Sequence, residues 1–446
     1  MIARRQDMTK GRRRLKPVIA QIFPAILAFS ALTVPAGPAA AQTAAIAEQA
    51  PAHGFSAERL ERITALLEQQ VEENRIAGAV VMVQQDGRDV YSRAVGWRDR
   101  EARAPMREDT IFRIASQSKA LTSVAAMMLV EEGRLLLDDP VGKHLPEWQD
   151  TTVAVAREGG GYDVVPAKRP ITIRDLLTHT AGISYGDGPA EDAWRKAGIT
   201  HWYFANRDEP VSAVVARMAA LPMARQPGEA FVYGYNTDIL GVVVETISGQ
   251  TLDAFLRERL IEPLGMKDTS FYLPRGKADR LAVVYADEED GSSRAPDAAN
   301  AGSEKPFGQG HYLDGPRVAF SGGAGLLSTA ADYSRFLEMM RRGGELDGRR
   351  YLSPKTVELM TVNHLVPEIG YAAGKGFGLG FAIREDLGLA GEPGSEGEFG
   401  WGGAYASQYW VDPKEHLTVS YMVQLLPSGD NDIPGKLRAL IYQAME

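Results

Sequence analysis

Strand-like patterns lie near both ends of this 446-residue sequence, and helical patterns fill its middle. Near the N-terminus, the runs 79–84 and 90–95 are joined around Asp86-Gly87, a dipeptide typical of tight hairpin turns. Near the C-terminus, three further runs predict strands: 377–383, 405–411 and 417–424. The economical arrangement is one antiparallel sheet built from both chain ends. We therefore predict an α+β fold with a mostly helical insertion.

Amphipathic helices flank the predicted strands. Apolar residues recur at helical spacing through 56–74, and a closing helix is predicted over 433–445, beginning near Pro434. The stretch 275–316 is polar and shows neither helical nor strand periodicity. It therefore predicts a long surface loop.

The first 41 residues have the pattern of an export signal. Basic residues between Arg4 and Lys16 precede an apolar run over 18–34, and Ala39-Ala40-Ala41 follows as a small-residue cleavage site. Prolines interrupt the run, which favours a cleaved signal over the alternative of a membrane anchor. We expect removal after about Ala41 and a periplasmic or secreted protein, exported by either the general or the twin-arginine route.

The remaining chain is predicted to fold as one domain over 42–446, since no linker separates independent parts. Its sheet subdomain is expected at about 55–110 and 370–446, and its helical subdomain at about 111–369. A chain with 44% hydrophobic and 24% charged residues can bury a large core.

Composition excludes several classes of function. The sequence has no cysteine, which removes disulfides, thiolate metal sites and cysteine nucleophiles. A net charge of −9 argues against nucleic acid as a partner. The seven histidines lack metal-binding spacing, and no second apolar run reaches membrane-spanning length. We expect no metal and no stable membrane span once the signal is removed, and oligomeric state is left open.

One tetrapeptide, Ser116-Gln117-Ser118-Lys119, places a hydroxyl and an amine three residues apart on one helix face. Apolar residues continue behind it at helical spacing until Gly133. A serine needs a neighbouring base to become a nucleophile, and a lysine can be that base only when its amine is uncharged, a state that burial favours. Taken alone, a serine at a helix start is usually only a cap.

Two downstream stretches carry the other groups that acyl transfer requires. Tyr233 precedes an apolar helical pattern, and a phenol close to the lysine could share its proton and pass it to the leaving group. Trp401-Gly402-Gly403-Ala404 precedes a predicted strand, where paired glycines let backbone amides approach a ligand. The amides of Ser116 and Ala404 are then the natural pair of donors to an oxyanion.

Together these three elements resemble the signature of the serine β-lactamase and penicillin-binding protein superfamily. The resemblance covers nearly the whole chain after the signal, and it is nearest to the class C β-lactamase-like branch and, within it, to the family VIII carboxylesterases. Five supporting stretches agree: 109–113, 136–140, 176–182, 263–266 and 321–326.

The resemblance implies a helical domain packed on an antiparallel sheet, with a cleft between them. By position it implies that Ser116 is the acylated nucleophile, Lys119 its activator and Tyr233 the proton shuttle. The segment from Trp401 to Ala404 would line the cleft. Neither a metal nor an organic cofactor is expected.

Two departures from the family pattern bear on the substrate. Penicillin-recognising relatives usually carry Lys or His where Trp401 stands, and tryptophan offers only a neutral N–H and an apolar face. They also commonly have Asn two places after the tyrosine, where this chain has Tyr235. Trp401, Gly402, Gly403 and Tyr235 are our candidate substrate-binding residues. Both departures weaken recognition of an anionic amide and favour small neutral esters.

Two other residues invite a functional reading that we do not favour. Gly182-Ile183-Ser184-Tyr185-Gly186 matches the G-x-S-x-G elbow of α/β-hydrolases, but a helical pattern rather than a strand precedes it. Ser184 is therefore predicted to be a loop residue. His179 is predicted to make structural hydrogen bonds at a helix end.

The sequence thus predicts an exported serine hydrolase that works through an acyl-enzyme, most simply a carboxylesterase. A β-lactamase or D,D-peptidase could use the same residues. Two alternatives remain: a transacylase, and a sensor that binds a ligand without turnover. Fold resemblance does not choose among their substrates.

Overall fold

The computed structural model describes residues 54–297, 308–427 and 432–446. The predicted export signal lies outside these residues and stays a prediction. The description below concerns the unit that begins at Ala50.

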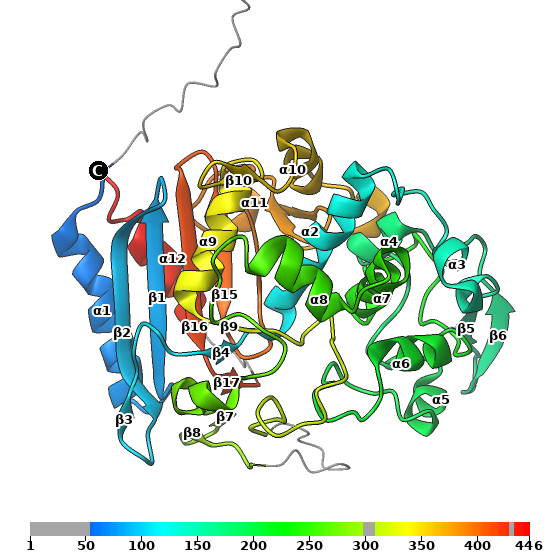
Figure 1. The fold of residues 1–446 in the computed structure, drawn as a ribbon, viewed down its shortest axis with the longest axis horizontal. Coiled ribbons are helices and arrows are strands. Elements are labelled where there is room, and N and C mark those ends of the chain that lie inside the picture. The colour runs from blue at the N-terminus through cyan, green and yellow to red at the C-terminus, as the bar shows by residue number, and fades with distance from the viewer. Residues whose placement is uncertain (1–53, 298–307, 428–431) are drawn as a thin grey trace, which may run out of the picture. The chain divides into compact units, whose positions relative to one another are not determined.

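An antiparallel sheet of eight strands joins the two ends of the described chain, as predicted (Figure 1). Strand β1 (Gly78–Gln85) is central, because it pairs with β2 (Arg88–Asp99) on one side and with β16 (Leu417–Val423) on the other. The sheet runs in the order β12-β13-β14-β15-β16-β1-β2-β3. The other strands are β3 (Ala104–Pro105), β12 (Lys375–Phe377), β13 (Ala382–Arg384), β14 (Phe399–Gly402) and β15 (Gln408–Asp412).

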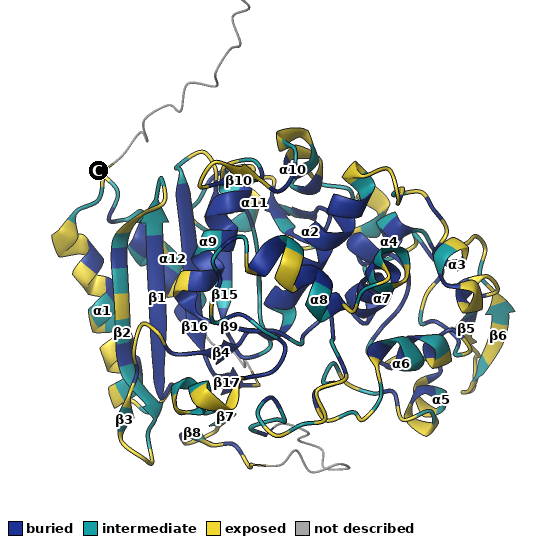
Figure 2. Cartoon of the chain, viewed as in Figure 1, coloured by how far each residue is buried: buried dark blue, intermediate teal, exposed yellow. Residues whose placement is uncertain are grey.

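Helices cover both faces of this sheet. Helix α1 (Ala57–Glu72) contacts β1, β2 and α12 (Ile433–Tyr442), and helix α9 (Ala330–Arg341) contacts β1, β15 and β16. Side chains alternate between the two faces of a strand. In β1, Val81 and Val83 join the cluster under α1 and α12, whereas Val80 and Met82 join the larger cluster on the other face. Burial on both faces explains why β1 is apolar nearly throughout (Figure 2).

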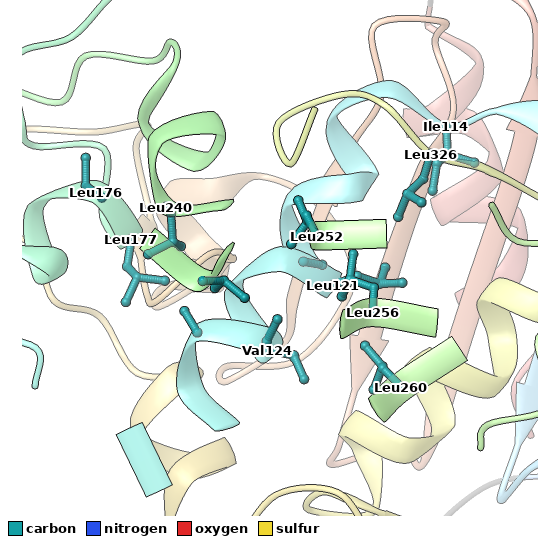
Figure 3. Packing of buried hydrophobic residues seen from close by; sticks show 14 of the residues in the cluster. Ile114, Leu121, Val124, Leu176, Leu177, Leu240, Leu252, Leu256, Leu260 and Leu326 are labelled. Atoms are coloured by element: carbon teal, nitrogen blue, oxygen red, sulfur yellow. The ribbon is translucent and has the colours of Figure 1, made fainter. Parts of the chain in front are cut away.

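The middle of the chain is mostly helical, again as predicted. Helix α2 (Ser118–Glu131) packs against α7 (Asn236–Ser248) and α8 (Leu252–Leu256), and α4 (Ile173–Leu177) packs on α7. Figure 3 shows Leu121 and Val124 of α2 among leucines of these helices. Because nearly every residue of α2 is buried, this helix is a rigid base for residues at its N-terminus.

Shorter elements complete the described chain. The helices are α3 (Val141–His144), α5 (Glu191–Lys196), α6 (Val211–Met218), α10 (Pro354–Met360) and α11 (Leu387–Ala390), with the π-helical turn η3 (Arg257–Ile261) and 3₁₀ turns at Ala115–Gln117 (η1), Pro146–Trp148, Arg275–Arg280 and Pro367–Ile369. The small strands are β4 (Phe112–Arg113), β5 (Thr152–Ala156), β6 (Tyr162–Pro166), β7 (Tyr285–Glu288), β8 (Gly291–Arg294), β9 (Leu327–Ser328), β10 (Glu345–Leu346), β11 (Arg349–Arg350) and β17 (Leu425–Leu426).

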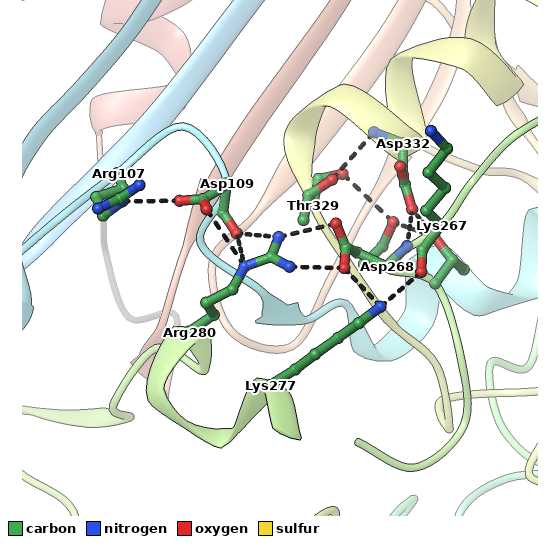
Figure 4. Close-up of polar contacts among 10 residues, drawn as sticks. Arg107, Asp109, Lys267, Asp268, Lys277, Arg280, Thr329 and Asp332 are labelled. Carbon is green, nitrogen blue, oxygen red and sulfur yellow. Dashed lines mark hydrogen bonds and ion pairs between the residues drawn. The ribbon is translucent and has the colours of Figure 1, made fainter. Parts of the chain in front are cut away.

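Two of the expectations for local structure were wrong. The stretch 275–316 is not one irregular loop, because β7 and β8 form a hairpin within it that pairs with β17. Near the start of this stretch, Arg280 forms ion pairs with Asp268 and Asp109 (Figure 4). The run 377–383 is not one strand but the turn between β12 and β13, which Gly380 makes with φ of +98°.

Among the residues that the structure describes, no single helix is long and apolar enough to cross a membrane. One bent pair, α7 with the segment 252–261, meets the criteria of length and composition together.

Candidate active site

Ser116 lies in the turn η1 between strand β4 and helix α2. The residue before it, Ala115, has φ of +42°, a left-handed conformation that costs an alanine about 1–3 kcal/mol. Neighbouring contacts hold this turn in place, since the Ile114 amide donates to the Leu326 carbonyl at 3.1 Å. A strained turn on a rigid helix presents the Ser116 hydroxyl at a defined position.

Lys119 is one helical turn further along and is 2% exposed. Its Nζ lies 3.3 Å from Ser116 Oγ, 3.1 Å from the Tyr185 hydroxyl and 2.7 Å from the Gly323 carbonyl oxygen. The predicted pairing of this amine with the serine hydroxyl is therefore present in the structure. Three polar neighbours fix the position of the amine.

Tyr233 reaches the same place from the loop before α7. Its ring centroid is 4.7 Å from Lys119 Nζ, and its hydroxyl accepts a hydrogen bond of 3.0 Å from Trp401 Nε1. The amine therefore faces the ring of this tyrosine, while the indole of Trp401 holds its hydroxyl. The indole N–H of Trp401 therefore already has a hydrogen-bond acceptor within the protein.

His179 packs against Tyr233, with ring centroids 4.7 Å apart. Burial lowers the pKa of His179 well below its ordinary value, and the charge of Lys119 acts in the same direction. Its Nδ1 lies 2.9 Å from Asn236 Nδ2, so the neutral ring accepts a hydrogen bond there. The histidine thus makes the structural contacts that the sequence predicted, and they support the loop that carries Tyr233.

Tyr185 is a site residue that the sequence reasoning missed. Burial raises the pKa of its phenol well above the ordinary value, and Tyr233 and Asp238 add to this effect. The hydroxyl therefore stays protonated as a partner of Lys119. Its neighbour Ser184 attracted attention through the G-x-S-x-G pattern, but Ser184 Oγ donates to the Asp187 carbonyl at 2.6 Å within the loop.

The end of β14 approaches the serine turn very closely. A Cβ added at Gly403 would lie 2.6 Å from the Ile114 carbonyl oxygen, so only glycine fits there. This approach places Ala404 beside Ser116 on the wall of the cleft. Within the described ranges, the Ala404 amide donates to no protein acceptor.

These residues surround a cleft of about 480 Å³. Its lining includes Ser116, Tyr185, Tyr233, Tyr371 and the four residues from Trp401 to Ala404. The prediction that Tyr235 binds substrate was wrong. Its side chain is fully buried, lies outside this lining and donates to the His201 carbonyl at 2.6 Å. The residue turns into the helical core, where its ring stacks on Trp194. In the part of the chain that is described, no three acidic or histidine side chains are grouped to hold a metal ion.

Comparison with known proteins places this geometry in a family. Residues 63–443 match the β-lactamase family. The chain is 34% identical to esterase EstB of Burkholderia gladioli over 377 residues, which cover 80% of this chain and 88% of that protein.

Solved structures agree. EstCE1, described as a hydrolase with promiscuous acyltransferase activity, superposes with a TM-score of 0.74 at 31% identity, covering 86% of this chain and 99% of that one. Simvastatin synthase (LovD) of Aspergillus terreus superposes with a TM-score of 0.69 at 25% identity, covering 87% of this chain and 98% of that one. The family model matches most of the chain, and similar proteins include an esterase and a hydrolase. The chain therefore belongs to the β-lactamase family and is a serine hydrolase.

Proposed function

We propose that this protein is a carboxylesterase that hydrolyses small neutral esters through an acyl-enzyme on Ser116. The observation that carries the proposal is the 3.3 Å contact between Lys119 Nζ and Ser116 Oγ inside a buried site. The esterase EstB among its relatives supports the choice of ester substrates.

In the acylation step, Lys119 takes the Ser116 proton while Oγ attacks the ester carbonyl. An uncharged amine has two hydrogens and one lone pair. The hydrogens are directed to the Gly323 carbonyl and the Tyr185 hydroxyl, which leaves the lone pair for the serine O–H. The backbone amides of Ser116 and Ala404 donate to the oxyanion as it forms.

The leaving alcohol then receives this proton through the Tyr233 hydroxyl. Because Trp401 donates to the phenol oxygen, the hydrogen of that hydroxyl is free to point toward the cleft. Deacylation repeats the sequence with water as the nucleophile: Lys119 takes one proton from water, and the acid product leaves as the serine O–H is restored.

The two tyrosines should differ in their effect on catalysis. We expect Tyr233→Phe to lower kcat for a p-nitrophenyl ester about 10²- to 10³-fold, because a proton transfer is lost. We expect Tyr185→Phe to lower it only about tenfold, because one hydrogen bond to the lysine is lost. Steady-state kinetics of both variants would check this, and a larger loss in Tyr185→Phe would exchange the two roles.

The charges around the cleft support neutral substrates. Three cationic side chains line it: Lys375, Arg384 and Arg438. Each is paired with a carboxylate, since Lys375 and Arg384 contact Glu392 at 3.4 and 3.1 Å and Arg438 contacts Glu398 at 2.6 Å. Tyr371 and Trp401 add aromatic rings to the wall of the cleft.

A direct comparison of substrates tests the proposal. We expect kcat/KM for p-nitrophenyl butyrate to exceed that for a chromogenic cephalosporin by at least about 10²-fold, because a bound carboxylate would find only cations that are already paired. Faster turnover of the cephalosporin would identify a β-lactamase instead. Stoichiometric acylation without turnover would identify a sensor.

Acyl transfer is the second candidate, favoured by the described acyltransferase activity of the similar EstCE1. Adding a small alcohol to the ester assay and measuring the new ester against the free acid would separate transfer from hydrolysis.

A further inference from the structure

Asp238 is a buried carboxyl group that the mechanism above does not use. It lies in the first turn of α7, is 1% exposed and contacts no basic side chain within ion-pair distance among the described residues. Burial raises the pKa of this carboxyl, while the charge of Lys119 opposes the shift. A buried, unpaired carboxyl group beside a reactive lysine is costly, which calls for an explanation.

A continuous chain of hydrogen bonds connects this carboxyl to the lysine. Ser321 Oγ donates to Asp238 Oδ1 at 2.6 Å, and the Ala324 amide donates to Ser321 Oγ at 3.1 Å. The same peptide unit presents the Gly323 carbonyl, which accepts from Lys119 Nζ at 2.7 Å. Hydrogen bonds in series polarise one another, most strongly in a buried site.

The turn that carries this chain is fitted tightly between α2 and α7. Thr122 Oγ1 donates to the Gly322 carbonyl, and the Leu326 amide donates to Ser118 Oγ, so the turn is fixed to α2. A Cβ added at Gly323 would lie 2.4 Å from Asp238 Oδ2, so glycine is required for the carboxyl to fit. The Gly323 amide also donates to Asp238 Oδ1 at 3.1 Å.

We propose that Asp238 is a positioning residue that strengthens Lys119 as a base through Ser321 and the Gly323–Ala324 peptide. In its ionised form, this carboxyl makes the Gly323 carbonyl a better acceptor for the ammonium group that forms when Lys119 takes the serine proton. The inference rests on the proposed function, since it concerns the same proton transfer. Three other titratable side chains face the amine, and they stay unchanged in the test: Tyr185, Tyr233 and His179.

The test is the pH profile of kcat/KM for p-nitrophenyl butyrate in Asp238→Asn. The amide keeps the shape and an acceptor atom but loses the charge. We expect a roughly tenfold lower plateau and an acid limb that moves about one pH unit lower, which corresponds to a tenfold change in the protonation equilibrium of the base. The limb moves down because the charged amine loses its stabilising partner.

Ser321→Ala interrupts the chain while leaving the carboxyl in place. We expect a shift in the same direction but smaller, since the direct bond from the Gly323 amide remains. This variant also decides the matter if Asp238→Asn fails to fold. The matched control is Asp332→Asn, a buried carboxyl in the first turn of α9 that accepts from the Asp268 amide and Thr269, away from the cleft (Figure 4). It should leave the pH profile unmoved.

An acid limb that stays in place in both Asp238→Asn and Ser321→Ala would overturn the inference, even if activity falls, because that pattern is what a purely structural role produces. The proposed function would still stand in that case if Ser116→Ala is inactive. Ester hydrolysis that persists in Ser116→Ala would instead overturn the proposed function itself.

Discussion

Replacing Ser116 with alanine should lower ester hydrolysis by about 10⁴-fold or more and abolish labelling by a fluorophosphonate probe. The substitution removes the atom that forms the acyl-enzyme, and the remaining oxyanion donors and cleft retain only a small part of the rate enhancement. Steady-state kinetics on p-nitrophenyl butyrate and intact-protein mass spectrometry measure the two effects. The substitution is small, and we expect thermal unfolding to change little.

Ser184→Ala is the matched control. That serine is the alternative nucleophile by sequence pattern, and its hydroxyl bonds within its own loop. We expect labelling and kcat/KM within a few-fold of the native protein. Mass analysis of the labelled peptide should find the probe on Ser116, and a probe on Ser184 would reverse the assignment.

Lys119→Met should be the next most damaging change, lowering kcat/KM by about 10³-fold or more. Methionine matches the length and the apolar contacts of the buried side chain but cannot take a proton. The Gly323 carbonyl and the Tyr185 hydroxyl also lose their donor, so a stability loss of about 1–3 kcal/mol is expected. Rates of fluorophosphonate labelling in single turnover would isolate the acylation step.

Lys143→Met tests whether the loss of any lysine has such an effect. Lys143 pairs with Asp139 on helix α3, and its side chain is 54% exposed. Asp139 is buried but keeps His144 and the Leu136 amide as partners when Lys143 is replaced, and Lys143 does not line the cleft, so activity should be unchanged. Near-native kcat/KM in Lys119→Met would remove the general base from the mechanism.

Much of the fold could be predicted because its strongest patterns are local. The helix over 56–74 appears as α1, with the Ser56 side chain accepting from the Arg59 amide as an N-cap. The run 417–424 appears as β16, and its pairing with β1 follows from the need to bury two apolar strands. One error came where glycine allows a turn inside an apolar run, at Gly380, and the other came where the short strands β7 and β8 are mostly polar.

The site was predictable only where one stretch carried a family pattern. Ser116, Tyr233 and the 401–404 segment line one cleft, and the buried Lys119 contacts Ser116 Oγ. Tyr185 is 66 residues from Lys119 in the chain, and no local pattern signals their contact. The sequence also placed Tyr235 wrongly. This residue directly precedes helix α7, and its side chain is buried in the helical core rather than exposed in the cleft.

The central position of β1 also affects how the chain must be made. This strand is synthesised early, yet β16, its partner on one edge, follows roughly 330 residues later, which takes on the order of 20 to 60 seconds at ordinary translation rates. Until then the edge of β1 that pairs with β16 lacks its partner, although α1 precedes β1 in the chain and can already cover one of its faces. The nascent chain, more than the finished enzyme, is therefore the form most exposed to aggregation.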